Sequence, residues 1–147
     1  MEKSNKTTLI LPTCFVGGIG GFLGSFIFLP IMTVIPGTFF MVLAGMSTGM
    51  GQMVTQNFAG WVIHALVNSL WGGLFGLLFG QRKGNFSLFA IPWSLLLALL
   101  VILANPLVGL PVTGQLVLIE GGAYLLFGLI LGLSLQFSKG WFQKGAE

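Results

Sequence analysis

The stretch WVIHALVNSLWGGLFG, residues 61–76, is almost wholly apolar, yet it contains His64 and Asn68 and ends in a series of glycines. It belongs to an uncharged run that extends to Gly80. An apolar run of about 20 residues is long enough to cross a bilayer as a helix. The stretch therefore predicts a transmembrane helix with polar side chains inside it.

Further runs of this kind lie on both sides of it. The four predicted spans are residues 9–33, 59–80, 87–105 and 115–137. The composition agrees, because 6% of the residues are charged, whereas soluble proteins have about 25%. The sequence thus predicts an all-α fold, a polytopic transmembrane helix bundle in which residues 1–147 form a single integral membrane domain.

The positive charges predict the orientation of these spans. All six Lys and Arg residues fall at three places in the sequence. If the chain has four spans, these three places lie on the same side of the membrane. They are Lys3 and Lys6, Arg82 and Lys83, and Lys139 and Lys144. Because cytoplasmic loops of membrane proteins are rich in Lys and Arg, we expect the protein in the cell (inner) membrane with both termini in the cytoplasm.

Residues 36–57 leave a second topology open. The segment carries no charge and is too apolar for an exposed loop of its length. It predicts either a re-entrant or interfacial helix, covered by protein, or a fifth span. A fifth span places Lys3 and Lys6 on the outer side, which conflicts with the distribution of positive charge, so we favour four spans.

The two halves of the chain align without a gap after a shift of 56 residues, which places residues 30–85 on residues 86–141. The aligned positions include His64 with Glu120, Asn68 with Tyr124, Gly72 with Gly128 and Gly76 with Gly132. The alignment is explained either by a parallel internal repeat, as in some transporters, or by the chance similarity of apolar helices.

Glycines at a spacing of four residues predict close helix packing, since small residues let two helix backbones approach each other. The glycines that we assign to such packing faces are Gly17, Gly21, Gly24, Gly72, Gly76, Gly128 and Gly132. They predict how tightly the helices pack, and they indicate no chemistry.

Polar side chains inside the predicted spans form a candidate polar intramembrane site. They are His64 and Asn68 in one span and Glu120 and Tyr124 in another. Ionisable groups within a span are unfavourable in lipid and commonly face the bundle interior or a polar path. We expect His64 and Glu120 to pair, on the same or a neighbouring chain, sharing a proton or binding a polar or cationic solute. The alternative is a purely structural hydrogen bond between helices.

The residue content argues against other kinds of site. The chain has one histidine, one cysteine, three acidic residues and no aspartate, so we expect no metal site, no cofactor and no Ser-His-Asp set. We therefore expect a protein that is not an enzyme, although a non-catalytic subunit of a membrane enzyme complex fits. A net charge of +3 is too small to indicate nucleic-acid binding. The expected partners are membrane lipids and other membrane protein subunits or further copies of this chain.

The stretches GWVIHALVNSLWGGLFG, residues 60–76, and ANPLVGLP, residues 104–111, follow a glycine-rich first span. In these features the chain resembles the YagU-type small inner-membrane proteins of prokaryotes. The likeness covers mainly the second to fourth predicted spans and implies a four-helix architecture. Those proteins have no assigned activity, so the resemblance implies no function. Where it leads us to expect another histidine in the last helix, this sequence has Glu120.

Two functions fit these observations. In the first, the protein is an accessory or structural subunit that packs its glycine faces in a larger membrane protein complex. We favour this function because the chain is small and has almost no soluble loop for capturing a ligand. In the second, copies of the chain form a homo-oligomeric channel or transporter whose path is lined by His64 and Glu120.

Overall fold

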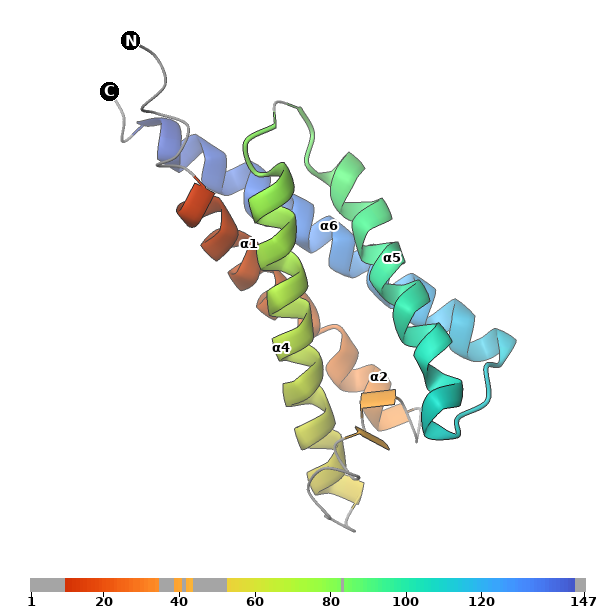
Figure 1. The fold of residues 1–147 in the computed structure, drawn as a ribbon. Coiled ribbons are helices and arrows are strands. Elements are labelled where there is room, and N and C mark those ends of the chain that lie inside the picture. Colours follow the sequence, from red (N-terminus) through yellow and green to blue (C-terminus); the bar gives the residue numbers. More distant parts are fainter. Residues whose placement is uncertain (1–9, 35–38, 41, 44–52, 83, 145–147) are drawn as a thin grey trace.

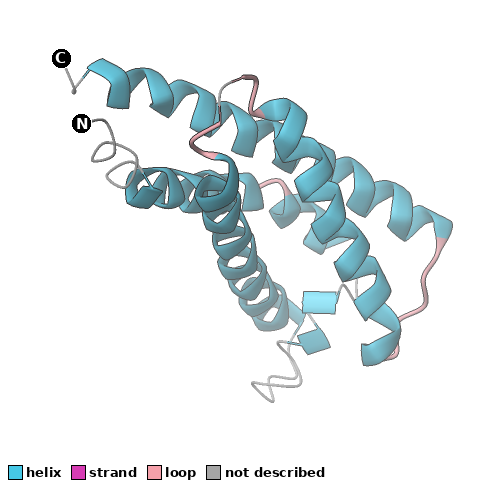
Figure 2. Ribbon diagram, turned by 45° about the horizontal axis from the view of Figure 1, so that its top comes forward, coloured by secondary structure: helices cyan, strands magenta, loops and turns pink. Residues whose placement is uncertain are grey.

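The computed structural model of the chain describes residues 10–34, 39–40, 42–43, 53–82 and 84–144. Its helices are α1 (Ile10–Ser25), α2 (Phe28–Val34), α4 (Met53–Phe79), α5 (Ser87–Ala104), the short 3-10 helix η2 (Asn105–Val108) and α6 (Gly114–Lys144) (Figure 1). No strand occurs in the described ranges (Figure 2). The predicted all-α helix bundle is confirmed.

Four helical segments are long and apolar enough to cross a membrane, and they agree closely with the predicted spans. They are Leu11–Ile31, Phe58–Phe79, Ser87–Val108 and Gly114–Ser138. By this length and composition the chain is a multi-pass membrane protein. The possible re-entrant segment or fifth span, residues 36–57, lies for the most part outside the described residues.

The first span is interrupted between α1 and α2, and Pro30 explains the interruption. Pro30 has no backbone N–H to donate to the carbonyl of Phe26. That carbonyl instead accepts the N–H of Leu29, at 3.3 Å. The neighbouring carbonyl of Ser25 accepts the indole N–H of Trp61 from α4, at 3.2 Å. Backbone groups freed inside a membrane need such partners, so the break in the first span is held by α4.

The bundle has three main interfaces, in which α1 packs against α4, α5 against α6, and α1 against α6. α4 and α5 are close near their connecting loop and diverge away from it (Figure 1). We call the end of the bundle with the loop of residues 80–86 the Arg82 end. The opposite end, where residues 109–113 connect η2 to α6, is the Gly109 end. Each candidate span runs between these two ends.

The α1–α4 interface is a contact between two backbones, and we call it the glycine seam (Gly17, Gly21, Gly72 and Gly76). A Cβ atom added to Gly17 would overlap the carbonyl of Gly72, and one added to Gly72 would overlap the carbonyl of Gly17. A Cβ on Gly21 would meet the carbonyl of Asn68 in the same way. The crossing therefore requires glycine on both helices, as small residues permit in membrane proteins.

The other predicted packing glycines also contact this chain's own helices. Gly24 lies against the ring of Phe127, Gly128 against Ser94 and Gly132 against Ser87. All seven glycines singled out in the sequence are buried within the chain. The accessory-subunit interpretation expected these faces to pack on other subunits. In the structure they pack inside the bundle, each against the backbone or a side chain of a neighbouring helix.

Candidate polar site inside the bundle

The candidate polar site lies between α4 and α6, which both run from the Gly109 end toward the Arg82 end (Figure 1). α4 supplies His64 and Asn68, and α6 supplies Glu120 and Tyr124. Within each helix the two residues are four positions apart and so lie on one face. Exposure is 1% or less for His64, Asn68 and Tyr124 and 6% for Glu120. All four predicted site residues are thus buried in the bundle.

A hydrogen bond across the bundle joins His64 to Tyr124. The distance between His64 Nε2 and Tyr124 Oη is 2.9 Å, and Asn68 Nδ2 lies 3.5 Å from the same nitrogen. Both neighbours can donate to Nε2 together only when the ring hydrogen is on Nδ1. The contacts therefore favour a neutral imidazole protonated at Nδ1, which accepts from Tyr124 and more weakly from Asn68.

Aromatic rings cover the imidazole on its remaining sides. The centroid of the Phe28 ring of α2 is 4.1 Å from that of His64, at an interplanar angle of 86°. The centroid of the Phe40 ring, which belongs to the segment 36–57, is 4.6 Å from that of His64. Since Phe28, Phe40 and His64 are all buried, the His64–Tyr124 hydrogen bond is shielded from lipid and water.

Three buried side-chain polar atoms, two of them in the site, have no hydrogen-bond partner among the described residues. They are His64 Nδ1, Asn68 Oδ1 and Asn105 Oδ1. An unsatisfied polar group in a membrane interior is unfavourable by several kcal/mol. Asn105 belongs to η2 at the Gly109 end, and sequence analysis did not include it in the site. A polar residue at the end of the apolar run, in the motif ANPLVGLP, was the available signal.

Within one chain, Glu120 is not the hydrogen-bond partner of His64, and a pair between neighbouring chains stays a prediction. Among the described residues no hydrogen bond or ion pair joins Glu120 to His64, whose partners are Tyr124 and Asn68. Tyr124 lies four residues, or roughly 6 Å along the helix, farther toward the Arg82 end than Glu120. The relative position of α4 and α6 therefore sets Tyr124, and not Glu120, level with His64 within a single chain.

A second pair of aromatic residues connects α4 to α5 and was missed by sequence analysis. The indole N–H of Trp71 donates to the carbonyl of Trp93 at 3.0 Å, and the indole N–H of Trp93 donates to the carbonyl of Trp71 at 3.1 Å. Their rings are stacked, with centroids 4.5 Å apart. The sequence shows two tryptophans in two spans, but not that they face each other.

The site has the chemistry of a hydrogen-bonded polar cluster. Among the described residues no group of three or more His, Cys, Asp or Glu side chains is placed to hold a metal ion. No family model, curated protein or solved structure matches the chain. The interpretation of the site therefore depends on its own geometry, namely a buried histidine held between a tyrosine and an asparagine.

Proposed function

We propose that the protein is a small, non-catalytic subunit that packs in a larger membrane protein complex. The observation that carries this proposal is the buried His64–Tyr124 hydrogen bond, 2.9 Å long and covered by Phe28 and Phe40. A polar bond enclosed within one chain fixes α4 against α6 and offers no surface for substrate. The cluster thus supports a structural role for the chain.

The face that would meet a partner is on α6. Gly121 and Gly122 differ from the seven packing glycines, because a Cβ added to either would meet nothing within 4 Å. Gly122 is exposed, next to the exposed Leu118 and Leu126 of the same helix. Small residues in membrane helices allow close approach of another helix. We infer that a helix of a partner subunit packs on α6 over Gly121 and Gly122.

The test is purification of the tagged protein in mild detergent, followed by mass determination of the intact particle. We expect unrelated chains at a fixed ratio to this one. Gly122→Leu should release them without unfolding the chain, because its side chain points into open space. Leu99→Phe, an equally outward change on α5, should not. A closed homo-oligomer of this chain alone would contradict the proposal.

A channel or transporter is the second candidate, and the unpartnered atoms of His64, Asn68 and Asn105 favour it. Buried polar atoms without partners are typical of places that take up water or a polar solute. Under this hypothesis, purified protein in liposomes conducts protons or a small cation, and His64→Phe abolishes the flux. Flux by a homo-oligomer, lost in His64→Phe, would replace the subunit proposal.

The orientation that we propose places the Arg82 end in the cytoplasm, on the basis of the positive charges. In a Cys14→Ser background, Lys83→Cys and Gln143→Cys should react with an impermeant thiol reagent only after the inner membrane is opened. Val112→Cys should react in intact spheroplasts. Val112 is exposed and avoids the neighbouring Gly109, whose φ of 78° disfavours a side chain.

A further inference from the structure

Glu120 is the one acidic residue in the described ranges, and it lies within the candidate span Gly114–Ser138. Its side chain is buried. The sequence has no Lys or Arg in residues 7–81 or 84–138, so no such residue in the spanning part of the chain neutralises a carboxylate at this position. The other ionisable side chains in these two ranges are those of Cys14, His64 and Tyr124.

These three side chains form no hydrogen bond or ion pair with Glu120 in the part of the chain that the structure describes. The hydroxyl of Tyr124, which has one hydrogen to donate, lies 2.9 Å from His64 Nε2. His64 Nδ1 has no hydrogen-bond partner among the described residues. Cys14 belongs to α1 and lies against Gly73 of α4. The ionisable groups of the bundle therefore give Glu120 neither a cation nor a donor.

An ionised carboxylate in such a position is strongly unfavourable, because burial within a span removes water without supplying a cation. The carboxylate loses its charge by taking up one proton from water and becoming a neutral carboxylic acid, while the other groups of the site keep their protons. A metal ion fits less well, since it needs several ligands. Within the described part of the chain no group of three or more His, Cys, Asp or Glu side chains is placed to hold one.

The depth of Glu120 indicates the side from which a proton arrives. Glu120 is six residues from Gly114, where the candidate span begins at the Gly109 end, which is about 9 Å along a helix. It is 18 residues from Ser138 at the other end of the span, or about 27 Å. The shorter path to water thus leads to the Gly109 end.

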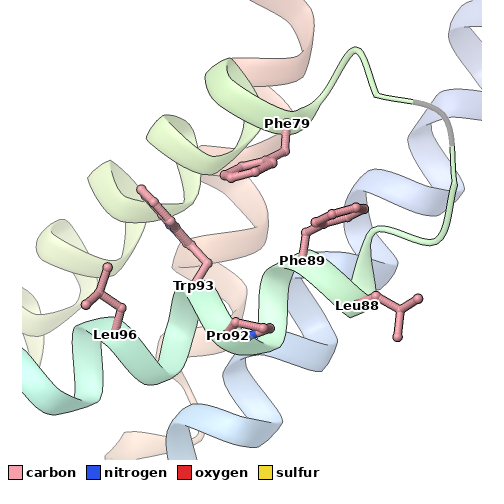
Figure 3. Close-up of a pocket in the computed structure, with 6 residues that line it drawn as sticks. All are labelled: Phe79, Leu88, Phe89, Pro92, Trp93 and Leu96. Atoms are coloured by element: carbon pink, nitrogen blue, oxygen red, sulfur yellow. The ribbon is translucent and has the colours of Figure 1, made fainter.

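The longer path, toward the Arg82 end, passes apolar side chains. Three of them follow on α6 and are 2% exposed or less, namely Phe127, Leu131 and Leu135. The groove between α4 and α5 at the Arg82 end is apolar as well, and Figure 3 shows the rings of Phe79, Phe89 and Trp93 around it. Such a layer offers a proton no polar groups to follow.

We propose that Glu120 is a reversible proton-binding site that exchanges with water at the Gly109 end of the bundle. Binding and release change the charge of the interior one helical turn from Tyr124, whose hydroxyl bonds to His64. The inference concerns a single chain and does not depend on the subunit function proposed above.

Dicyclohexylcarbodiimide provides the test, because it enters membranes, reacts with the neutral form of a carboxyl and leaves its own mass on the protein. With the whole protein in detergent at neutral pH, we expect the mass of one reagent molecule per chain. Labelling should fall as the pH is raised, since the carboxyl then loses its proton, and should be lost in Glu120→Gln. The infrared carbonyl band of a neutral carboxyl should likewise be present at neutral pH and lost in Glu120→Gln. No labelling and no band in the unmodified protein would overturn the proposal.

The matched control moves the carboxyl along the same helix, in the double variant Glu120→Gln, Gln115→Glu. Gln115 is exposed, so a carboxyl there should be ionised and remain unlabelled at neutral pH. Labelling equal to that of the unmodified protein would show that burial at position 120 is unimportant. Protection by Na⁺ at constant pH would make the site one for a metal cation. Either result would overturn the proposal.

His64→Gln tests whether the proton belongs to Glu120 alone. Labelling should be unchanged, whereas a rise would show that His64, of the same or a neighbouring copy, had held Glu120 ionised, and would contradict the proposal.

The side of access is tested in sealed membranes with a buffered interior. Labelling should follow the pH of the medium in the preparation in which Val112→Cys reacts with an impermeant thiol reagent, because Val112 is exposed at the Gly109 end. In membranes of the opposite orientation it should not follow the medium. Equal dependence in both preparations, or dependence in the second alone, would contradict access from the Gly109 end.

Discussion

The two sides of α4 are held by opposite means. Toward α1, the backbone of Gly72 meets the backbone of Gly17, with no room for a Cβ atom on either. Toward α5 and α6, large side chains make the contacts, through the Trp71–Trp93 pair and the His64–Tyr124 hydrogen bond. The α1 side of α4 is held by direct contact between backbones, which the lack of side chains allows. The side toward α5 and α6 is held by hydrogen bonds of large side chains.

This difference predicts how each side responds to change. A backbone cannot move out of the way of a new methyl group, so a substitution in the glycine seam separates two helices. A side-chain contact loses only its own hydrogen bond or ring contact when one residue changes. The apolar groove lined by Phe79, Phe89 and Trp93 lies on the α5 side of α4.

The largest effect is expected in the glycine seam. Gly72→Ala places a methyl group on the carbonyl of Gly17, and we expect it to destabilise the bundle by about 3 kcal/mol, at the upper end of the usual range for overpacking. The adjacent Gly73→Ala is the matched control, since its Cβ would have ordinary contacts of 3.5 Å and more with Cys14. The measurement is thermal stability in detergent.

The same comparison can be made from α1, where Gly17→Ala should destabilise and Gly18→Ala should not, because the nearest atom to a Gly18 Cβ is 3.6 Å away. Within each pair the substitution and the helix are the same, so differences in helix propensity cancel. Equal stability of Gly72→Ala and Gly73→Ala would mean that the two helices do not touch along the seam.

A smaller effect is expected at the junction of α4 and α5. Trp71→Phe and Trp93→Phe each remove one indole hydrogen bond to a carbonyl, and each should destabilise by about 1 kcal/mol. Because the two rings stack 4.5 Å apart, the near-ultraviolet circular dichroism of the native protein should contain a contribution from the coupled pair. Either substitution should remove it, whereas Trp61→Phe should not.

The extent of the spans was predictable from the sequence, because the length of an apolar run and the distribution of charge are local properties. The presence of close glycine packing could also be expected from spacing. The helix that each glycine meets could not, since Gly17 and Gly72 are brought together only by the crossing of α1 and α4. Spacing defines a face of a helix and does not identify its neighbour.

The candidate site was predicted less completely. Burial of His64, Asn68, Glu120 and Tyr124 follows from polar residues inside apolar spans. The partner of His64 depends on how far α4 and α6 are shifted along their axes relative to each other. Packing across the bundle determines this shift, and a shift of one helical turn would give His64 another partner. We expected His64 to pair with Glu120, on the same or a neighbouring chain, because a buried carboxylate needs a cation, whereas within one chain the hydrogen bond of His64 goes to Tyr124. The cover by Phe40 also depends on tertiary structure.

The smallest expected effect is on the polar side of α4, and it distinguishes the two possible partners of His64. In a double-mutant cycle of His64→Phe with Tyr124→Phe, the second change removes only the hydroxyl that lies 2.9 Å from Nε2. We expect a coupling energy of about 0.6 kcal/mol, the average for hydrogen bonds between membrane helices. In the cycle of His64→Phe with Glu120→Ala, we expect a smaller coupling energy than in the first cycle, because within one chain the described hydrogen bonds of His64 go to Tyr124 and Asn68. Thermal stability in detergent provides both cycles, with Glu120→Gln included because an amide retains an acceptor and should be tolerated better than Ala.

Stronger coupling of His64 to Glu120 than to Tyr124 would mean that the two residues pair between copies of the chain, since within one chain His64 bonds to Tyr124. Such a result would favour the homo-oligomeric channel or transporter over the subunit function.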